Sequence, residues 1–205
     1  MSRRVVVATG NAHKLVEIRA ILAEMDGLAD LELVAMTELG VPSPVEDGET
    51  FEDNALLKAR ACAEATGSPA LADDSGLEVD ALGGEPGVRS ARYAGEPADD
   101  AANNAKLLAA LRDVAPPERT GRFVAAAALV TPDGAEVVVR GTMPGRIVDA
   151  PRGEHGFGYD PLFVAEVTAD GRTNGELTPT EKDAISHRGA AFRELAPHVA
   201  ARLSR

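Results

Sequence analysis

The chain has 205 residues and a formal net charge of −12, so we do not expect it to bind along a nucleic-acid duplex, which needs a basic surface. Aromatic residues are only 3% of the chain and Trp is absent, which argues against a stacking surface for long single strands. No apolar run approaches the ~20 residues that cross a bilayer, and the N-terminal one is too short for a signal peptide. The single cysteine, Cys62, excludes an intramolecular disulfide and fits a reducing, cytoplasmic location.

The first part of the chain predicts a βαβ unit. The apolar run VVVAT at 5–9 is typical of a buried parallel strand, and a tight Gly-Asn turn leads from it into a helix. Leu15, Ile18 and Leu22 recur at helical spacing, and LELVAM at 31–36 predicts the second strand.

The next two helices are marked by their ends and by their periodicity. A loop rich in Pro and acidic residues covers 41–49. After it, Thr50 is a candidate N-cap and Gly67 a candidate C-cap for one helix. An amphipathic pattern over 99–114 predicts the other helix.

The second half of the chain predicts a β-hairpin. Two β runs within 122–143 are joined by Pro-Asp-Gly at 132–134, and a glycine-rich loop at 151–164 runs into a short strand. The order of elements predicts an α/β protein with a mixed sheet, in which the hairpin forms part of a second lobe. No repeat or linker divides the chain, so we expect a single domain over residues 1–205.

The C-terminal segment predicts two helices, a short one over 178–185 and a longer one that begins after Ser186. Pro197 lies inside the longer helix and should kink or interrupt it. Ser186 as the N-cap places His187 and Arg188 in the first turn, where positive side chains are unfavourable unless they bind an anion or a carbonyl. A surface helix without function is the alternative.

The stretch LADDSGL at 71–77 contains two adjacent carboxylates that repel each other. We expect short strand pieces here, with Asp73 and Asp74 at the end of one of them. A polar turn explains the pair, because Asp, Ser and Gly all form turns. A site that handles a cation or a proton explains it equally well.

Three further motifs have both a structural and a functional explanation. TGNAHK at 9–14 opens a helix, whose N-terminus and Lys14 suit a phosphate, although the motif is not a P-loop. Asn54 and Lys58 share one helix face behind an acidic loop, which is also typical of a solvated face. GFGYDP at 156–161 presents aromatic rings between glycines, which suits the binding of a flat ligand. An ordinary Gly/Pro turn explains the motif equally well.

Together these motifs are complementary. Glu46, Asp73 and Asp74 offer the oxygen ligands that a hard cation such as Mg²⁺ prefers. Lysines and a helix N-terminus offer charges for phosphates, and the aromatic loop with His187 and Arg188 offers a place for a base. The combination predicts a nucleoside triphosphate site without a P-loop.

The chain resembles a known family. Five motifs occur in the same order as in the inosine triphosphate pyrophosphatase family, whose bacterial members are called dITP/XTP pyrophosphatases: TGNAHK, VEDGETFEDNALLKAR, LADDSGLEVDALGGEPGVRSARYAG, GFGYDP and EKDAISHRG. The resemblance covers nearly the whole chain. It implies a twisted mixed sheet flanked by helices, two lobes with a central cleft, a homodimer and dependence on Mg²⁺.

The resemblance also implies roles for individual residues. Asp74 matches the catalytic proton acceptor, and Glu46 and Asp74 match the metal-binding carboxylates. The substrate-binding positions fall in all five motifs and comprise Thr9, Gly10, Asn11, Ala12, His13, Lys14, Lys58, Ser75, Phe157, Gly158, Tyr159, Asp160, Lys182, His187 and Arg188. The N-terminal motif and Lys58 are implied to bind the triphosphate, and the last two motifs the nucleobase.

The implied reaction is hydrolysis of noncanonical purine nucleoside triphosphates (ITP, dITP and XTP) to the monophosphate and pyrophosphate, by attack of water on the α-phosphorus. Such an enzyme cleanses the nucleotide pool. Hypoxanthine and xanthine carry a 6-keto acceptor where adenine carries an amino donor, so Arg188, with His187 as a second candidate, is expected to donate to it. Two alternatives are a pyrophosphatase of the related septum-inhibition type, which acts on pyrimidine or modified nucleotides, and a sensing module that binds triphosphates without turnover.

Overall fold

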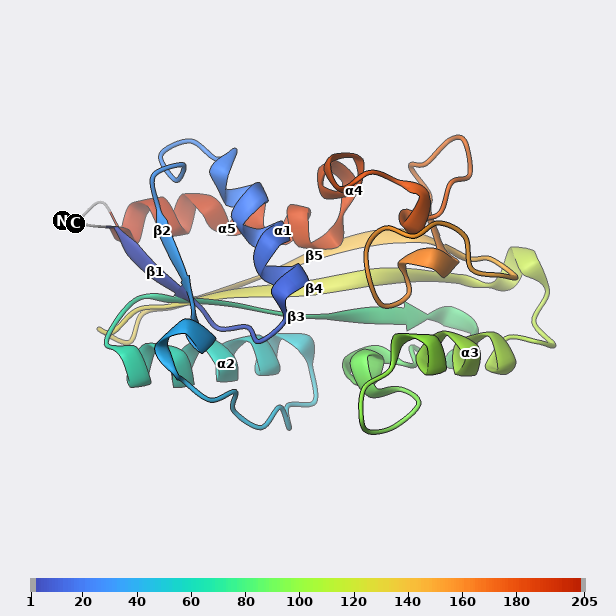
Figure 1. Ribbon diagram of the computed structural model, residues 1–205, viewed down its shortest axis with the longest axis horizontal. Helices are drawn as coiled ribbons and strands as arrows, with labels where there is room; N and C mark the ends of the chain where they lie inside the picture. Colours follow the sequence, from blue (N-terminus) through green and yellow to red (C-terminus); the bar gives the residue numbers. More distant parts are fainter. Residues whose placement is uncertain (1–2, 204–205) are drawn as a thin grey trace. The chain divides into compact units, whose positions relative to one another are not determined.

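The structure is a computed structural model that describes residues 3–203, and the chain forms two compact units (Figure 1). The first unit contains Met1–Asp74, Ala125–Gly141 and Arg188–Arg205, and the second contains Ser75–Val124 and Thr142–His187. Each unit is therefore assembled from stretches that are far apart in the sequence. The predicted single domain and central cleft stay predictions.

The first unit is built on the predicted βαβ element. The strand β1 (Arg4–Val7) lies parallel between β2 (Glu32–Ala35) and the start of β3 (Ala70–Val79). The crossover from β1 to β2 is the helix α1 (Ala12–Ala23). Val5, Val6 and Val7 are fully buried, as expected for a parallel strand whose two faces are both covered by helices.

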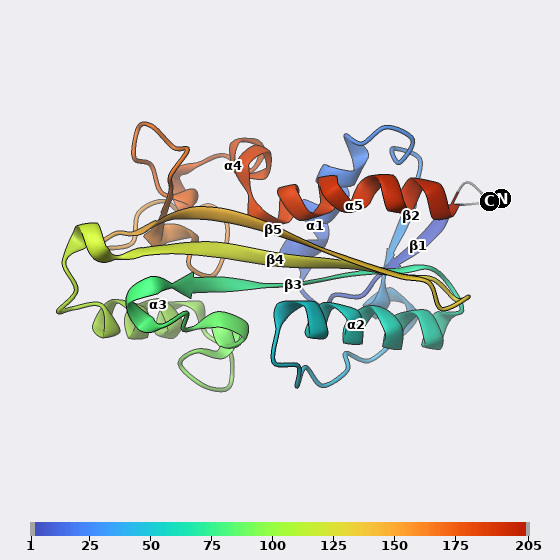
Figure 2. The same ribbon diagram turned by 180° about the vertical axis from the view of Figure 1, so that it is seen from behind.

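Helices cover both faces of the sheet in the first unit. One face packs against α1 and α5 (His187–Leu203), and the opposite face packs against α2 (Phe51–Thr66) (Figures 1 and 2). Ile18 and Leu22 of α1 and Phe192 of α5 join the core of the first face. The caps of α2 are those predicted: Thr50 Oγ1 accepts a hydrogen bond from Asp53 N, and Gly67 ends the helix with φ of 60°.

The second unit contains the remaining halves of the long strands. These are the end of β3, parts of β4 (Thr120–Val130) and β5 (Glu136–Ile147), and the short β6 (Phe163–Ala165), which pairs antiparallel with β5. Within this unit, α3 (Asp100–Ala110) lies on one face of the strands and α4 (Pro179–Ile185) on the other (Figure 2).

The sheet is mixed, as predicted, with strand order β2-β1-β3-β4-β5-β6. Short 3₁₀ helices connect the regular elements: η1 (Met36–Leu39), η2 (Asp80–Leu82), η3 (Gly87–Arg92), η4 (Pro116–Glu118), η5 (Asp160–Leu162) and η6 (Asn174–Glu176). Between residues 3 and 203, no helix is both long enough and apolar enough to cross a membrane.

The segment around the two aspartates differs from the prediction. Ala70–Val79 is one continuous strand and not several pieces, so Asp73 and Asp74 lie inside β3 and do not end it. Turn-forming residues are tolerated here because packing in the sheet overrides their local preference. Gly76 has a specific reason, since a Cβ at this position would overlap Ser90 and the carbonyl of Gly87.

Two other predictions are met only in part. The hairpin turn is present, with Thr131 N donating to Ala135 O at 3.0 Å, but the hairpin is shared between the units: Ala125–Gly141 belongs to the first, and the outer ends of β4 and β5 belong to the second. The helix α5 runs continuously to Leu203, so of the two expected effects of Pro197, a kink or an interruption, the interruption does not occur. Leu195 and Val199, on either side of the proline, are both buried in the core of the first unit, which compensates for the lost backbone hydrogen bond.

Cys62 provides a simple test of this fold. It is buried on α2, and burial raises the pKa of its thiol to about 11. Because the thiolate is the reactive form, we expect a disulfide reagent such as DTNB to modify the folded protein very slowly. One equivalent should react at once after unfolding in urea. Equally fast modification of the folded protein would contradict the packing of α2.

Candidate active site

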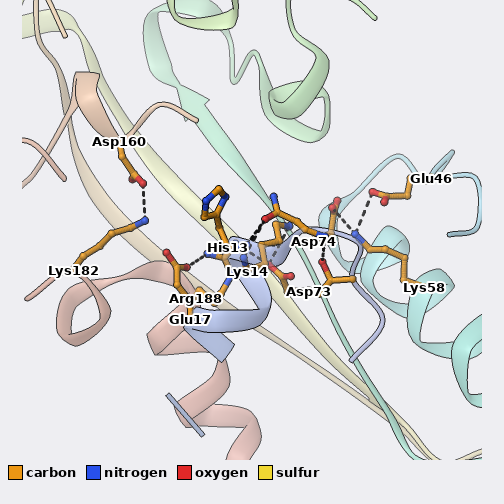
Figure 3. Close-up of polar contacts among 12 residues, drawn as sticks. His13, Lys14, Glu17, Glu46, Lys58, Asp73, Asp74, Asp160, Lys182 and Arg188 are labelled. Atoms are coloured by element: carbon orange, nitrogen blue, oxygen red, sulfur yellow. Dashed lines mark hydrogen bonds and ion pairs between the residues drawn. The ribbon is translucent and has the colours of Figure 1, made fainter. Parts of the chain in front are cut away.

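The two adjacent aspartates of β3 serve opposite faces of the first unit's sheet. Successive side chains of a strand point to opposite faces. Asp73 accordingly meets residues of α1 and α5, whereas Asp74 meets residues of α2 (Figure 3). Both side chains are buried, with exposed fractions of 1% and 7%. A buried carboxylate needs charged or hydrogen-bonding partners, and each aspartate has its own partners on its own face of the sheet.

Asp73 is held by two cations. Arg188 donates from Nε and Nη2 to Asp73 Oδ2, at 3.0 and 2.9 Å, and Lys14 Nζ lies 3.2 Å from the same oxygen. Arg188 also donates from Nη1 to Glu17, so one buried guanidinium joins α1, β3 and α5. Asp73 Oδ1 is buried and has no hydrogen-bond partner among residues 3–203.

These contacts give Arg188 a structural role besides the one expected for it. Its side chain is 1% exposed, and three of its nitrogens donate to carboxylates. Arg188 therefore holds Asp73 and Glu17, and its expected donation to a keto oxygen stays a prediction. Its two partners are 115 and 171 residues away in the sequence, beyond the reach of any local pattern.

Asp74 and Glu46 share one ammonium group. Lys58 Nζ donates to Asp74 Oδ1 at 3.0 Å and to Glu46 Oε2 at 3.2 Å (Figure 3). Asn54, one turn earlier on α2, donates from Nδ2 to Asp74 Oδ2 at 3.2 Å and accepts from Gly48 N at 2.8 Å. One face of α2 therefore orients both oxygens of Asp74 and connects them to the acidic loop.

The two aspartates differ in pKa. Burial alone would raise the pKa of Asp73, but the charges of Arg188 and Lys14 lower it below its ordinary value. For Asp74, burial is the largest effect and raises the pKa above its ordinary value despite the ammonium of Lys58. Asp73 is therefore a permanent anion, and Asp74 is the carboxylate better suited to accept a proton at neutral pH.

The N-terminal motif forms a preorganised turn before α1. Asn11 Oδ1 accepts from the backbone amides of His13 and Lys14, at 2.9 and 3.2 Å, and Asn11 N donates to Thr9 Oγ1 at 3.1 Å. Two of the amides that we expected to face a phosphate are thus bonded to Asn11. Burial lowers the pKa of Lys14, against the charge of Asp73, so a nearby anion would stabilise its ammonium form.

In the second unit, the GFGYDP motif folds around a buried carboxylate. Asp160 Oδ2 accepts from Lys182 Nζ at 2.6 Å and from Phe157 N at 2.9 Å. The same ammonium lies 4.9 Å from the centre of the Phe157 ring, within the range of a cation–π contact. Tyr159 is buried and donates from its hydroxyl to Ser90 O at 2.9 Å.

Residues of α3 hold the same loop. Asp100 Oδ2 accepts from Gly158 N at 2.7 Å, and Asn104 Nδ2 donates to Gly158 O at 2.9 Å. These two residues are four apart and share one face of α3. The backbone N–H and C=O of Gly158 are therefore both bonded to side chains of α3.

Two further predicted residues belong to the second unit. Ser75 is half-buried on β3. His187 is buried, and its ring stacks on Phe123 with 4.9 Å between ring centres and 15° between planes. In the sequence, Phe123 lies in an apolar strand pattern and carries no signal beyond that of a core residue.

The structure thus divides the predicted site residues between two groups, one in each unit. The first unit holds Thr9, Gly10, Asn11, Ala12, His13, Lys14, Glu46, Lys58, Asp74 and Arg188, and the second holds Ser75, Phe157, Gly158, Tyr159, Asp160, Lys182 and His187. The residues for which the sequence indicated no specific role in the site include Glu17, Asn54, Asp100 and Asn104, although Asn54 shares a helix face with Lys58. Helical spacing to Lys14 and Lys58 is the only signal available for the first two.

The carboxylates of the first unit fit a hard divalent cation. Glu46 and Asp74 converge on one point, where Lys58 now binds both, and carboxylate oxygens are the ligands that Mg²⁺ prefers. In the part of the chain that the structure describes, no group of three or more His, Cys, Asp or Glu side chains could hold a metal ion. Two carboxylates are nevertheless sufficient, because Mg²⁺ commonly completes its shell with water and substrate phosphates.

Comparison with known proteins decides the family. The sequence profile of the Ham1 family matches residues 5–198. The chain belongs to the Ham1 family. It is 55% identical over 202 residues to the dITP/XTP pyrophosphatase of Nocardia farcinica, covering 97% of this chain and 95% of that protein.

Solved structures of Ham1-family proteins have the same fold. A HAM1 protein from Coxiella burnetii aligns with a TM-score of 0.85 and 41% identity, over 98% of this chain and 100% of that one. The nucleoside-triphosphatase / dITP/XTP pyrophosphatase from Mycobacterium abscessus aligns with a TM-score of 0.73 and 50% identity, over 95% and 99%. The predicted family and the predicted α/β fold are therefore confirmed.

The Arg188–Asp73 pair yields a stability prediction. Replacing Arg188 by Met leaves the Asp73 carboxylate in the core with only Lys14 as a cation. We expect the free energy of unfolding to fall by ~3–5 kcal/mol, the usual result of breaking a buried ion pair, measured by urea denaturation.

Arg60 provides the matched control, because it binds Glu136 through two hydrogen bonds of 2.6 Å on the surface of the same unit. Replacing Arg60 by Met should cost only ~1 kcal/mol or less. A similar loss of unfolding free energy in the two variants would show that the buried Arg188–Asp73 pair stabilises the fold no more than a surface ion pair does.

Proposed function

We propose that this chain hydrolyses noncanonical purine nucleoside triphosphates (ITP, dITP and XTP) to the monophosphate and pyrophosphate. The observation that carries the proposal is the convergence of Glu46 and Asp74 on one ammonium, with both oxygens of Asp74 oriented by α2. Simple binding of a triphosphate does not require such an oriented pair of acids. The names of the Ham1-family relatives, dITP/XTP pyrophosphatase, support the substrate class.

Asp74 is the proposed proton acceptor. Asn54 and Lys58 orient its carboxylate before any substrate binds, and its raised pKa brings it closer to the pH at which a general base works best. In the proposed reaction, Asp74 takes a proton from the water that attacks the α-phosphorus, and pyrophosphate leaves.

The cations of the first unit are proposed to bind the triphosphate. Lys14 is a half-buried ammonium whose charge an anion would stabilise, and Lys58 can pass from the carboxylates to phosphate oxygens. Glu46 and Asp74 would then hold a divalent cation, which we propose to be Mg²⁺. When bound, that ion would neutralise charge on the phosphate oxygens as it develops.

The second unit is proposed to contact the nucleobase. The half-buried Phe157 offers a flat apolar ring, and the ammonium of Lys182 beside it donates hydrogen bonds but accepts none. Such a donor favours the 6-keto oxygen of hypoxanthine or xanthine over the 6-amino group of adenine. Lys182 therefore joins Arg188 as a proposed donor, and His187 stays a candidate contact.

The proposal includes three features that the resemblance and the composition support. The protein is expected to be a homodimer, to act in the cytoplasm, and to have nucleotides but neither nucleic acids nor membranes as partners. Sedimentation analysis of the purified chain tests the dimer.

A pyrophosphate-release assay on ITP, XTP, dUTP, GTP and ATP, with Mg²⁺ or with a chelator, tests the function. A donor left facing an amino group costs ~1–3 kcal/mol, so we expect kcat/KM for ITP and XTP to exceed that for ATP by at least ~10-fold. Guanine shares the keto group, so GTP should be rejected less strongly than ATP. The chelator should abolish turnover.

Other outcomes of the same assay identify the alternatives. A preference for dUTP would indicate a pyrophosphatase of the septum-inhibition type. Binding of ITP without release of pyrophosphate would indicate a nucleotide-sensing module. Either result would contradict the proposed function.

Asp74→Asn tests the catalytic assignment. The change keeps the shape but removes the charge that accepts the proton, so kcat should fall by ~10²–10⁴-fold or more, measured with ITP. Asp53→Asn is the matched control, because Asp53 lies on α2 but bonds to Thr50 at the helix start. Activity of Asp74→Asn within a few-fold of the control would rule out the assignment.

A further inference from the structure

Asp160 is a buried carboxylate whose two oxygens are both bonded within the second unit. Its exposed fraction is 2%. Oδ2 accepts from Lys182 Nζ at 2.6 Å and from Phe157 N at 2.9 Å, while Oδ1 accepts from Asn174 Nδ2 at 3.2 Å. A carboxylate in this state holds protein groups in place and is poorly placed to bind a ligand directly.

One oxygen of Asp160 sets the position of two different groups. The Phe157 backbone and the Lys182 ammonium both bond to Oδ2, and the ammonium lies 4.9 Å from the centre of the Phe157 ring. If the carboxylate rotated, the ring and the ammonium would lose their common anchor. The rotation of Asp160 therefore controls how these two groups are arranged.

Asn174 restrains that rotation. The terminal torsion of an aspartate is soft, because its rotamer wells are broad. The hydrogen bond from Asn174 to Oδ1 fixes the second oxygen, so the plane of the carboxylate is held at both ends. Asn174 is fully buried in η6.

The short helix η6 is itself fixed to the loop that precedes Asp160. His155 N donates to Gly175 O at 2.9 Å, and Thr173 Oγ1 donates to Arg152 O at 2.8 Å. A Cβ on Gly153 would overlap the Gly175 carbonyl, so the two backbones are in direct contact. These contacts fix the backbone of η6, and so they fix the position from which Asn174 bonds to Asp160.

The other end of the Asn174 amide shows that this residue is not an optimal core side chain. Its Oδ1 is buried and has no hydrogen-bond partner within residues 3–203. A buried polar atom without a partner is destabilising, and an apolar side chain would avoid it. The amide is therefore best explained by what its donor does for Asp160.

We propose that Asn174 is a positioning residue for base selectivity. It fixes the carboxylate of Asp160, which in turn holds the Phe157 ring and the Lys182 ammonium in the arrangement that accepts a 6-keto purine. Asp160 then acts through these two groups and not as a base contact of its own. This inference rests on the proposed function for the identity of the substrate, but its structural part is independent of it.

Asn174→Ala and Asn174→Asp test the inference. The first removes the donor, and the second keeps the shape but puts a second carboxylate against Asp160. Asn174→Ala should lower the ITP/ATP ratio of kcat/KM by about tenfold, the order expected for losing one hydrogen bond to a charged group. The loss should appear in KM for ITP with kcat nearly unchanged, and Asn174→Asp should show a larger loss.

Asn103→Ala is the matched control. Asn103 is an equally buried asparagine of the same unit, and it bonds to the backbone of Ala91 and Ala94, at 3.0 and 2.7 Å, and not to the Asp160 loop. This variant should unfold at lower urea concentration than wild type while its ITP/ATP ratio stays unchanged. A purely structural role for Asn174 predicts the same behaviour for Asn174→Ala.

Crystal structures of the two Asn174 variants separate this inference from the proposed function. We expect the Asp160 carboxylate to rotate and the Lys182 Nζ to Asp160 Oδ2 distance to lengthen from 2.6 Å. If that contact and the bond from Phe157 N are unchanged, or if the ITP/ATP ratio is unchanged in an enzyme that does prefer ITP, the inference is wrong. Failure of wild type to prefer ITP would instead overturn the proposed function.

Discussion

Burial of two adjacent carboxylates in one strand is the constraint on which the first unit depends. A charge in a protein interior costs several kcal/mol unless a partner compensates it, roughly 3–5 kcal/mol when one partner of a buried pair is removed. The compensation for β3 comes from three helices: Lys14 from α1, Lys58 from α2 and Arg188 from α5. These ion pairs link the three helices to the sheet beside the apolar core, and the same ion pairs build the candidate active site.

The alternation of side chains along β3 gives the two aspartates different chemistry. Asp73 faces a guanidinium and an ammonium, which hold its pKa low and keep it an anion. Asp74 faces an amide and a single ammonium that it shares with Glu46, and burial keeps its pKa high. The two neighbours thus have different roles: Asp73 is the counter-ion of Arg188 and Lys14, and Asp74 is the candidate general base.

The second unit uses a buried carboxylate for a different purpose. Asp160 gathers an ammonium, a backbone amide and a side-chain amide, and so fixes a glycine-rich loop that has little regular structure of its own. The face of α3 that carries Asp100 and Asn104 bonds to the same loop at Gly158. A loop held in this way can present Phe157 and Lys182 with little loss of conformational entropy on binding.

The sequence by itself determined the features that depend on neighbours within a few residues. The βαβ start, the caps of α2 at Thr50 and Gly67, and the start of α5 after Ser186 are all found as predicted, because each rests on local spacing or on a single turn. The five ordered motifs also identified the family.

Only the tertiary structure decided which of these residues act together. The continuity of β3 through Asp73 and Asp74, the pairing of Arg188 with Asp73, and the bond from Asn174 to Asp160 involve burial or partners on separate elements. An ion pair across 115 residues leaves no periodic signal in the chain, because its energy depends on desolvation that exists only after folding. For the same reason the pairing of Arg188 with Asp73 and Glu17 could not be predicted from its position in the chain.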